Sequence, residues 1–250
     1  MAKSKSPPAL ISTEADLKAF LSSISSASVL YLDLEGDNIS RNGAINIITI
    51  LLYPQKIVRL IDVMTLKELA FTVAADNGRT LKSVFESPKI PKYLWDVRND
   101  ADALWALYQV GLAGVTDIQL LEIATRFGQR TLLAGLDKAV RSSLKLGGDT
   151  LKAFLQAKKD MRKKMSTGVF SARPLEDATI QYCANDVLHL PALKAVYMQR
   201  IFPKILARVM RESAARVVEA QDPGYDPHGP TRKFGPWGSG AKERARVLTG

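Results

Sequence analysis

The stretch VLYLDLEGDNIS, Val29 to Ser40, places two acids near the end of an otherwise apolar run. Because side chains alternate between the faces of a β-strand, Asp33 and Glu35 share one face, with Cα atoms roughly 6.6 Å apart at about 3.3 Å per residue. Two carboxylates held this close repel each other and resist removal from water. Because such a pair lowers stability, its presence indicates a functional role for the two acids.

The composition is that of an ordinary globular protein with an excess of positive charge. Of the 250 residues, 46% are hydrophobic and 24% are charged, and the formal net charge is +10. A basic surface attracts polyanions and makes sequence-independent phosphate contacts. A lysine-rich surface without such a partner has the same composition, so charge alone favours nucleic acid only weakly.

Several classes of protein are excluded by what the sequence lacks. No apolar stretch approaches the roughly 18 residues of a membrane span. The first residues, MAKSKSPPAL, contain no apolar segment typical of a secretory signal. A single cysteine, Cys183, excludes an intramolecular disulfide and a cysteine-based zinc site. We therefore expect an intracellular protein, cytoplasmic or nuclear, with no membrane partner.

The apolar pattern predicts three antiparallel strands followed by alternating strands and helices. The three strands are SVLYLDL, AINIITILL and KIVRLIDV, preceded by a helix over STEADLKAFLSSI that Ser12 or Thr13 would cap. Such an order is typical of a mixed sheet with helices on both faces. The folded domain is expected over residues 12–221, between a flexible tail over residues 1–11 and a Gly/Pro-rich basic tail over residues 222–250.

Two later segments carry an acid whose direction a helix would fix. In YLWDVRNDADAL, Asp100 precedes Leu104 and Leu107 at i+4 and i+7, at the start of the buried stripe. Capping of the helix by an aspartate is the structural alternative for this segment. In QYCANDVLHL, Tyr182 and Asp186 are four residues apart and share a helix face. This spacing is also common on ordinary surface helices.

Other charged residues in the chain have simpler structural interpretations. Asp62 ends a strand in IDV and Asp117 precedes a helix in TDI, so both are interpreted as turn or cap residues. Arg173, in ARPLED, is expected to anchor the last helix of the domain through an ion pair.

The motifs, taken in order, resemble the DEDD superfamily of 3′-to-5′ exonucleases. They are D-x-E on a strand, an aspartate between a strand and a helix, and Y-x-x-x-D on a late helix. With its tyrosine, the last motif resembles that of the branch that includes the ribonuclease D-like enzymes. Within this branch, DLEGDNISRNGAINIITI most resembles the Egalitarian-like group. Trp95 departs from the histidine that usually begins the family's second motif. The resemblance, from about Val29 to Leu193, implies an α/β, ribonuclease H-like fold with a mixed five-stranded sheet flanked by helices.

The resemblance also implies a metal-dependent catalytic site. It assigns the metal-binding acids to Asp33, Glu35, Asp100 and Asp186, and the catalytic tyrosine to Tyr182. Two divalent cations, Mg²⁺ or Mn²⁺, suit such carboxylate ligands and would support in-line hydrolysis of a phosphodiester. The tyrosine would orient the attacking water or the phosphate, because a pKa of about 10 makes it a poor base at neutral pH.

Basic residues are expected to guide the nucleic acid toward these acids. Lys158 and Lys159 begin KKDMRKK, the densest basic run, and are candidate contacts with the phosphate backbone. A solvated helix face explains this run equally well. Arg41 and Arg98 lie near motif acids and are further candidate phosphate contacts.

The sequence thus predicts a 3′-5′ exonuclease that releases 5′ nucleoside monophosphates. The resemblance favours single-stranded RNA as the partner, whereas the residues themselves do not distinguish RNA from DNA. One alternative is a catalytically silent nucleic-acid-binding scaffold of the same fold, against which the complete set of four acids argues. A standalone DNA 3′-5′ exonuclease is the other.

Overall fold

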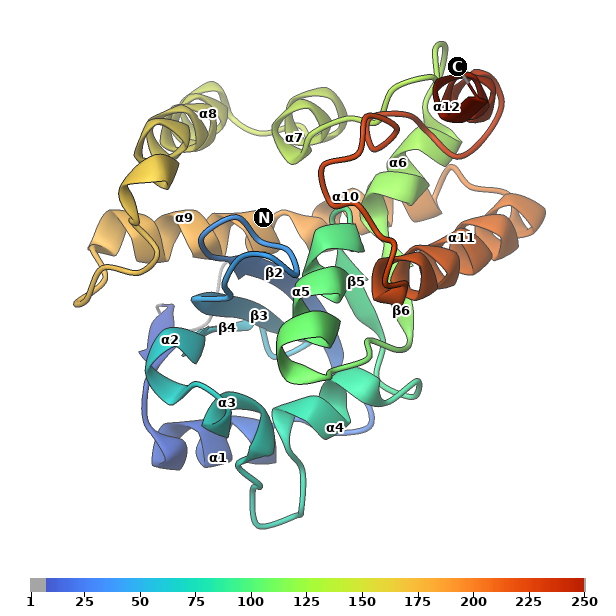
Figure 1. Cartoon of the computed structure of the whole chain (residues 1–250). Helices are drawn as coiled ribbons and strands as arrows, with labels where there is room; N and C mark the ends of the chain where they lie inside the picture. The colour runs from blue at the N-terminus through green and yellow to red at the C-terminus, as the bar shows by residue number, and fades with distance from the viewer. Residues whose placement is uncertain (1–7, 250) are drawn as a thin grey trace.

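The structure, a computed structural model, describes residues 8–249. Its centre is a mixed sheet with strand order β1-β4-β3-β2-β5-β6 (Figure 1). Strand β3 pairs antiparallel with both β2 and β4. The other pairs are parallel: β1 with β4, β5 with β2, and β6 with β5. The strands are β1 (Ala9–Ile11), β2 (Val29–Glu35), β3 (Ile47–Tyr53), β4 (Ile57–Asp62), β5 (Lys92–Leu94) and β6 (Val115–Asp117).

The mixed α/β sheet is confirmed, but it has six strands where we expected five. The additional strand is β1, which lies in the segment that we had assigned to a flexible tail. Its three residues pair with β4, from Ala9 opposite Arg59 to Ile11 opposite Ile61, and the Ile11 side chain is buried. Three residues are too few to show the period-two pattern by which a strand is recognised. The rest of the expected tail, residues 1–7, lies outside the described residues.

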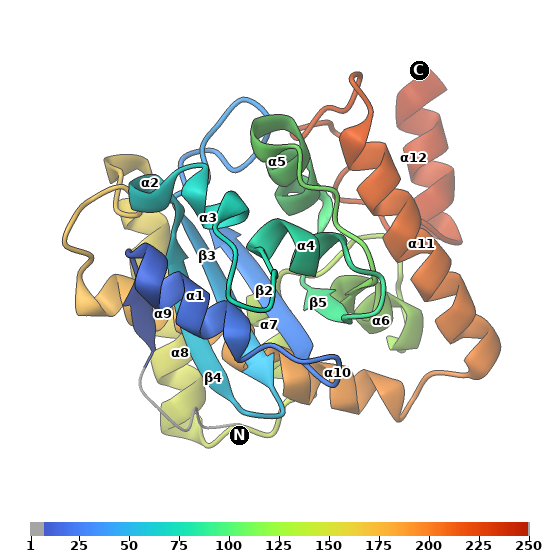
Figure 2. The same cartoon turned by 90° about the horizontal axis from the view of Figure 1, so that it is seen from below.

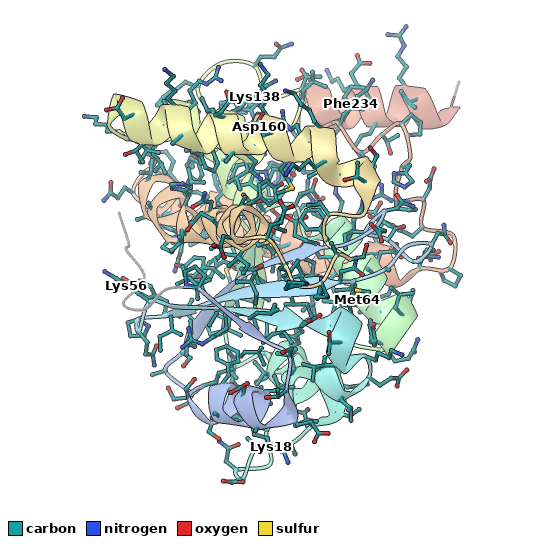
Figure 3. The ribbon with its side chains drawn as sticks, turned by 90° about the vertical axis from the view of Figure 1, so that its left-hand side faces the viewer. Lys18, Lys56, Met64, Lys138, Asp160 and Phe234 are labelled. Atoms are coloured by element: carbon teal, nitrogen blue, oxygen red, sulfur yellow. The ribbon has the colours of Figure 1, made fainter. Side chains whose placement is uncertain are left out.

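Helices cover both faces of the sheet, and each face has its own hydrophobic core. Figure 2 shows the face beneath α1, α3 and α4. On the opposite face α9 and α10 lie against the sheet, and α8 lies above α9 (Figure 3). The helices are α1 (Glu14–Ser22), α2 (Val63–Leu66), α3 (Leu69–Thr72), α4 (Leu81–Glu86), α5 (Arg98–Tyr108), α6 (Ile118–Thr125), α7 (Leu136–Ser143), α8 (Gly148–Lys164), α9 (Asp177–Leu188), α10 (Leu190–Met198), α11 (Pro203–Gln221) and α12 (Ser239–Thr249).

Side-chain alternation along β2 decides where its acids point. The leucines of this strand belong to the core beneath α1, α3 and α4, whereas Tyr31 belongs to the core beneath α9. Asp33 and Glu35 follow Tyr31 at intervals of two residues and so lie on the α9 side. Because α9 packs across β2, β3 and β4 (Figure 1), both carboxylates at the end of β2 face this helix.

Several helices begin at the side chains that the sequence indicates as caps. Thr13 Oγ1 accepts the N–H of Asp16 at 3.2 Å in the first turn of α1. Asp62 and Asp117 accept backbone N–H groups at the starts of α2 and α6, which confirms their expected roles. The expected ion pair of Arg173 is also present, because its guanidinium bonds both carboxylate oxygens of Asp62 at 2.5 and 2.9 Å. This pair ties the segment before α9 to the end of β4.

The segment after α11 runs back over the domain to α12 (Figure 2). Tyr225 Oη donates to Asn99 Oδ1 at 2.8 Å, and Phe234 bridges Leu132 in the loop after α6. This basic segment, expected as a tail, thus contacts α5 near its start and ends in a helix. None of the helices within residues 8–249 combines the length and the apolar character needed to cross a bilayer.

Candidate active site

Three of the predicted metal-binding acids meet at one point between the sheet and α9. Asp33 and Glu35 end β2, and Asp186 comes from α9, more than 150 residues later in the chain. One carboxylate oxygen from each lies within 4.8 Å of the other two. Glu35 and Asp186 are 8% and 3% exposed, so two of the three charges are almost removed from water. The fold therefore concentrates negative charge in a site where burial makes it unfavourable.

Asp100 lies in the first turn of α5 and is 8% exposed. It is not among the three acids within 4.8 Å of one another. The turn from β5 into α5 contains Asp96 at a φ of 62°. The carboxylate of Asp117 accepts the N–H groups of Asp96 and Val97, both at 3.0 Å, and so fixes this turn. Since the N-cap residue of α5 is Val97 and no side chain caps the helix, the capping alternative for Asp100 does not hold.

The four acids hold protons more tightly than ordinary carboxyl groups do. Burial and the charge of Asp186 raise the pKa of Asp33 to about 7. Burial and the charge of Asp33 raise the pKa of Glu35 and of Asp100 well above their usual range. The pKa of Asp186 is also raised, chiefly by burial, although the charge of Lys158 opposes this. Without a cation, the site cannot be fully ionised at neutral pH without a loss of stability.

Tyr182 completes the predicted catalytic set from one turn before Asp186 on α9. Its side chain is 5% exposed, and its hydroxyl lies at the acid cluster. Burial and the charges of Glu35 and Asp186 raise its pKa above the usual value of 10.0. The hydroxyl therefore stays protonated at neutral pH. It can donate a hydrogen bond, but it cannot serve as a base.

A lysine of the chain itself lies among these acids. Lys158 Nζ, on α8, donates to Asp186 Oδ2 at 2.5 Å and to Tyr182 Oη at 3.3 Å. It also lies 4.6 Å from the centroid of the Tyr182 ring. We had placed Lys158 on the path of the nucleic acid, whereas the structure directs its ammonium group into the acid cluster. No local pattern signals this, because it depends on α8 packing over α9 (Figure 3).

The donor set fits a hard divalent cation. Asp186 Oδ1 is buried and has no hydrogen-bond partner among the described residues. The same is true of Thr49 Oγ1, and Thr49 lies opposite Asp33 in the sheet. Mg²⁺ and Mn²⁺ prefer carboxylate oxygens, which are the ligands offered here. A cation bound to Asp186 Oδ1 would offset the repulsion between the carboxylates of the cluster.

Arg41 and Arg98, which we had proposed as phosphate contacts, bind groups of the protein instead. Arg41 Nε donates to Asp102 at 2.7 Å, and its terminal nitrogens donate to carbonyl oxygens at the end of α11 and just beyond it. Arg98 bonds both oxygens of Asp96 at 2.6 Å and the carbonyl oxygen of Arg232 at 3.0 Å. Both arginines anchor the C-terminal segment beside α5. Sequence proximity to the motif acids did not indicate which acid each arginine would pair with.

A groove of about 490 Å³ opens between α7 and α8, beside the acid cluster. Lys159 lines this groove, and Lys158 lies between the groove and the acids. The one acid of the lining, Asp137, pairs with Arg162 at 3.0 Å. The groove is therefore strongly basic. Its basic residues are Arg141, Lys152, Lys158, Lys159 and Arg162.

Known structures share this fold. RNase D from Trypanosoma brucei in complex with RNA U12 has a TM-score of 0.74 and 22% identity, over 96% of this chain and 79% of that chain. RNase D from Escherichia coli has a TM-score of 0.60 and 18% identity, over 85% of this chain and 50% of that one. NrnC from Brucella melitensis, bound to pGG, has a TM-score of 0.53 and 18% identity, over 81% of this chain and 90% of that chain. The ribonuclease D-like fold is thus confirmed.

Among curated proteins, none matches the sequence. The finer similarity to the Egalitarian-like group, which none of the matches tests, stays a prediction. The model of the 3′-5′ exonuclease family matches residues 8–200, which contain all four predicted acids and the tyrosine. With that match over more than half of its length, the chain belongs to the 3′-5′ exonuclease family.

Proposed function

We propose that this protein is a metal-dependent exonuclease that shortens single-stranded RNA from its 3′ end and releases 5′ nucleoside monophosphates. The observation that carries the proposal is the meeting of Asp33, Glu35 and Asp186 at a buried oxygen, Asp186 Oδ1, that no other described residue hydrogen-bonds. In a member of the 3′-5′ exonuclease family, such a cluster is best explained as a set of metal ligands.

Asp33, Glu35 and Asp186 would hold divalent cations, and Asp100 would contribute from α5. Two such ions, when bound, supply an activated water and stabilise the charge on the leaving 3′ oxygen. The carboxylates are held by a strand and two helices, so they are positioned before substrate arrives. Because ligands must be deprotonated, the raised pKa values of these acids imply that binding a cation releases protons.

The protonated hydroxyl of Tyr182 would orient the attacking water or the scissile phosphate. Its hydroxyl lies at the acid cluster, and its side chain is buried, so its position is restricted by the packing of α9. A phenol with a raised pKa keeps its proton throughout the reaction. Removal of the hydroxyl should therefore lower the rate without removing the metal ligands.

The basic groove between α7 and α8 is suited to the phosphate backbone of a single strand. Lys159 and its neighbours would contact phosphates on the 5′ side of the scissile nucleotide. We favour RNA because T. brucei RNase D, which has the same fold, is seen in complex with RNA U12.

The test is a gel time course on 5′-labelled single-stranded RNA and DNA oligomers of matched sequence. Each is incubated with Mg²⁺, with Mn²⁺ or with EDTA, beside the Asp33→Asn variant. We expect a ladder that shortens from the 3′ end of RNA, needs a metal and is absent in the variant. Equal shortening of DNA would make the protein a general or DNA exonuclease. Binding of either oligomer without any ladder would overturn the proposal in favour of a silent scaffold.

A further inference from the structure

Lys158 is held inside the acid cluster more firmly than a surface lysine would be. Its side chain is 13% exposed, and that of its partner Asp186 is 4% exposed. Nζ contacts Asp186 Oδ2 and Tyr182 Oη, and it lies over the Tyr182 ring, so three contacts define its position. Long lysine side chains usually keep the ammonium group in water. Here the ammonium group is directed inward, toward three carboxylates.

Charge explains this placement. Asp33, Glu35 and Asp186 lie within 4.8 Å of one another, and the site has no other ion-pair partner among the described residues. One ammonium group offsets part of their repulsion. It satisfies Asp186 Oδ2, whereas Oδ1 of the same carboxylate has no hydrogen-bond partner within residues 8–249. The lysine therefore neutralises the cluster only in part, with an ion that belongs to the chain.

We propose that Lys158 is a built-in competitor of the divalent cation, and that its ammonium group must leave Asp186 for the site to bind metal fully. The inference rests on the proposed function, because it takes the acid cluster to be a metal site. The lysine has a place to go, since it also lines the basic groove between α7 and α8. After leaving Asp186, the ammonium group would face the groove and add a positive charge there. Metal binding would in this way prepare the groove for phosphate.

The opposite role for Lys158 is easily distinguished. If the lysine served to hold Asp186 in the geometry that the metal needs, its removal would weaken metal binding, as the loss of groups supporting metal ligands generally does. If it competes, its removal strengthens metal binding, because a positive charge no longer occupies the ligand. The two roles thus predict changes of opposite sign in the same dissociation constant.

The experiment is a calorimetric titration of the full chain with Mn²⁺, in the absence of nucleic acid. Lys158→Gln removes the charge and can still donate a hydrogen bond to Asp186. Lys158→Met also removes that hydrogen bond and serves as the second variant. The matched control is Lys163→Gln, which removes a charge from the same helix at a residue whose side chain is 67% exposed. Melting temperatures in EDTA establish that each variant is folded.

We expect the Mn²⁺ dissociation constant of Lys158→Gln to be about tenfold lower than that of the wild type, a change of the size typical around metal ligands. Lys163→Gln should bind Mn²⁺ as the wild type does. An unchanged or weaker affinity in both Lys158 variants would overturn the inference. If the wild type binds Mn²⁺ and degrades RNA in that case, the proposed function stands and only the competition fails. If no form binds Mn²⁺ or cleaves, both fail.

Discussion

Asp96 and Asp100 are four residues apart at the start of α5, yet their surroundings differ completely. Asp96 receives two hydrogen bonds from Arg98, both of 2.6 Å. Burial alone would raise its pKa, but Arg98 and the charge of Arg216 lower it overall. Asp100 forms no ion pair with any described residue, and burial together with the charge of Asp33 raises its pKa well above the usual range.

This contrast separates two groups of acids in the domain. The first, the ion-paired acids, are the half-buried Asp96 and the buried Asp62, Asp102, Asp117 and Glu122, each with an arginine within 2.7 Å. The second, the site acids, are Asp33, Glu35, Asp100 and Asp186, for which Lys158 is the only ion-pair partner among residues 8–249.

Buried charges are tolerated when they are paired, and otherwise they lower stability. The charges of the ion-paired acids are therefore compensated within the fold, whereas those of the site acids are largely uncompensated and would be offset by the proposed cations. Asp117 shows that the first group serves the second, since it fixes the turn that positions Asp100.

The largest effect is expected when a site acid loses its charge. Asp33→Asn should lower the rate of RNA degradation by roughly 10³-fold or more, because cation stabilisation of the transition state contributes several kcal/mol. Asp37→Asn, two residues after Glu35 and exposed, is the matched control and should retain full activity. Single-turnover rates on a 5′-labelled RNA oligomer measure the difference. A variant at position 33 with near-normal rates would show that this acid is not a metal ligand.

Replacement of an ion-paired acid by its amide should instead lower the stability of the fold. Asp117→Asn leaves Arg216 without its 2.6 Å partner in a fully buried position. Loss of one member of a buried pair lowers the free energy of unfolding by about 3–5 kcal/mol, or roughly 10 °C in melting temperature. The melting temperature of Asp117→Asn in EDTA, compared with that of the exposed Asp37→Asn control, measures this loss of stability. If Asp117→Asn melts at the same temperature as the wild type, the ion pair between Asp117 and Arg216 does not stabilise the fold.

Addition of metal should stabilise the protein through the site acids. A ligand that binds only the native state at 100 times its dissociation constant adds about 2.7 kcal/mol to the free energy of unfolding. Mn²⁺ should therefore raise the melting temperature of the wild type and of Asp37→Asn, but not that of Asp33→Asn. An equal rise in all three proteins would place the metal somewhere other than the cluster.

The stability of the metal-free protein should depend on pH, because the pKa of Asp33 is raised in the fold. Asp33 has an ordinary pKa of 3.8 in the unfolded chain and about 7 in the fold. Between these values the folded protein keeps a proton that the unfolded chain loses, so stability falls as pH rises from about 4 to 7. Melting temperatures of the metal-free wild type, relative to Asp33→Asn, should decline across this range and level off above it. A constant difference would mean that the acid is already ionised in the fold.

The meeting of Asp33, Glu35 and Asp186 follows in part from local periods that can be read in the sequence. Alternation along β2 puts Asp33 and Glu35 on one face, and the i,i+4 spacing puts Tyr182 beside Asp186. The motif order then links these segments through the family resemblance. The short strand β1 and the helix α12 lack such a signal.

The partners of the basic residues could not be predicted from the sequence. The inward position of Lys158 depends on α8 lying over α9, and the pairing of Arg41 with Asp102 joins residues 61 positions apart. Long flexible side chains find their partners only after the backbone is in place. For this reason lysines and arginines were the residues whose roles the structure changed most.

The most direct test of the division into two groups is the melting temperature of Asp33→Asn in EDTA. If Asp33 lies in an unpaired cluster that lowers stability, removal of its charge relieves repulsion. We then expect this variant to melt at or above the wild-type temperature, despite being inactive. A clear decrease, comparable to that of Asp117→Asn, would mean that Asp33 supports the fold as the ion-paired acids do. It would contradict the account.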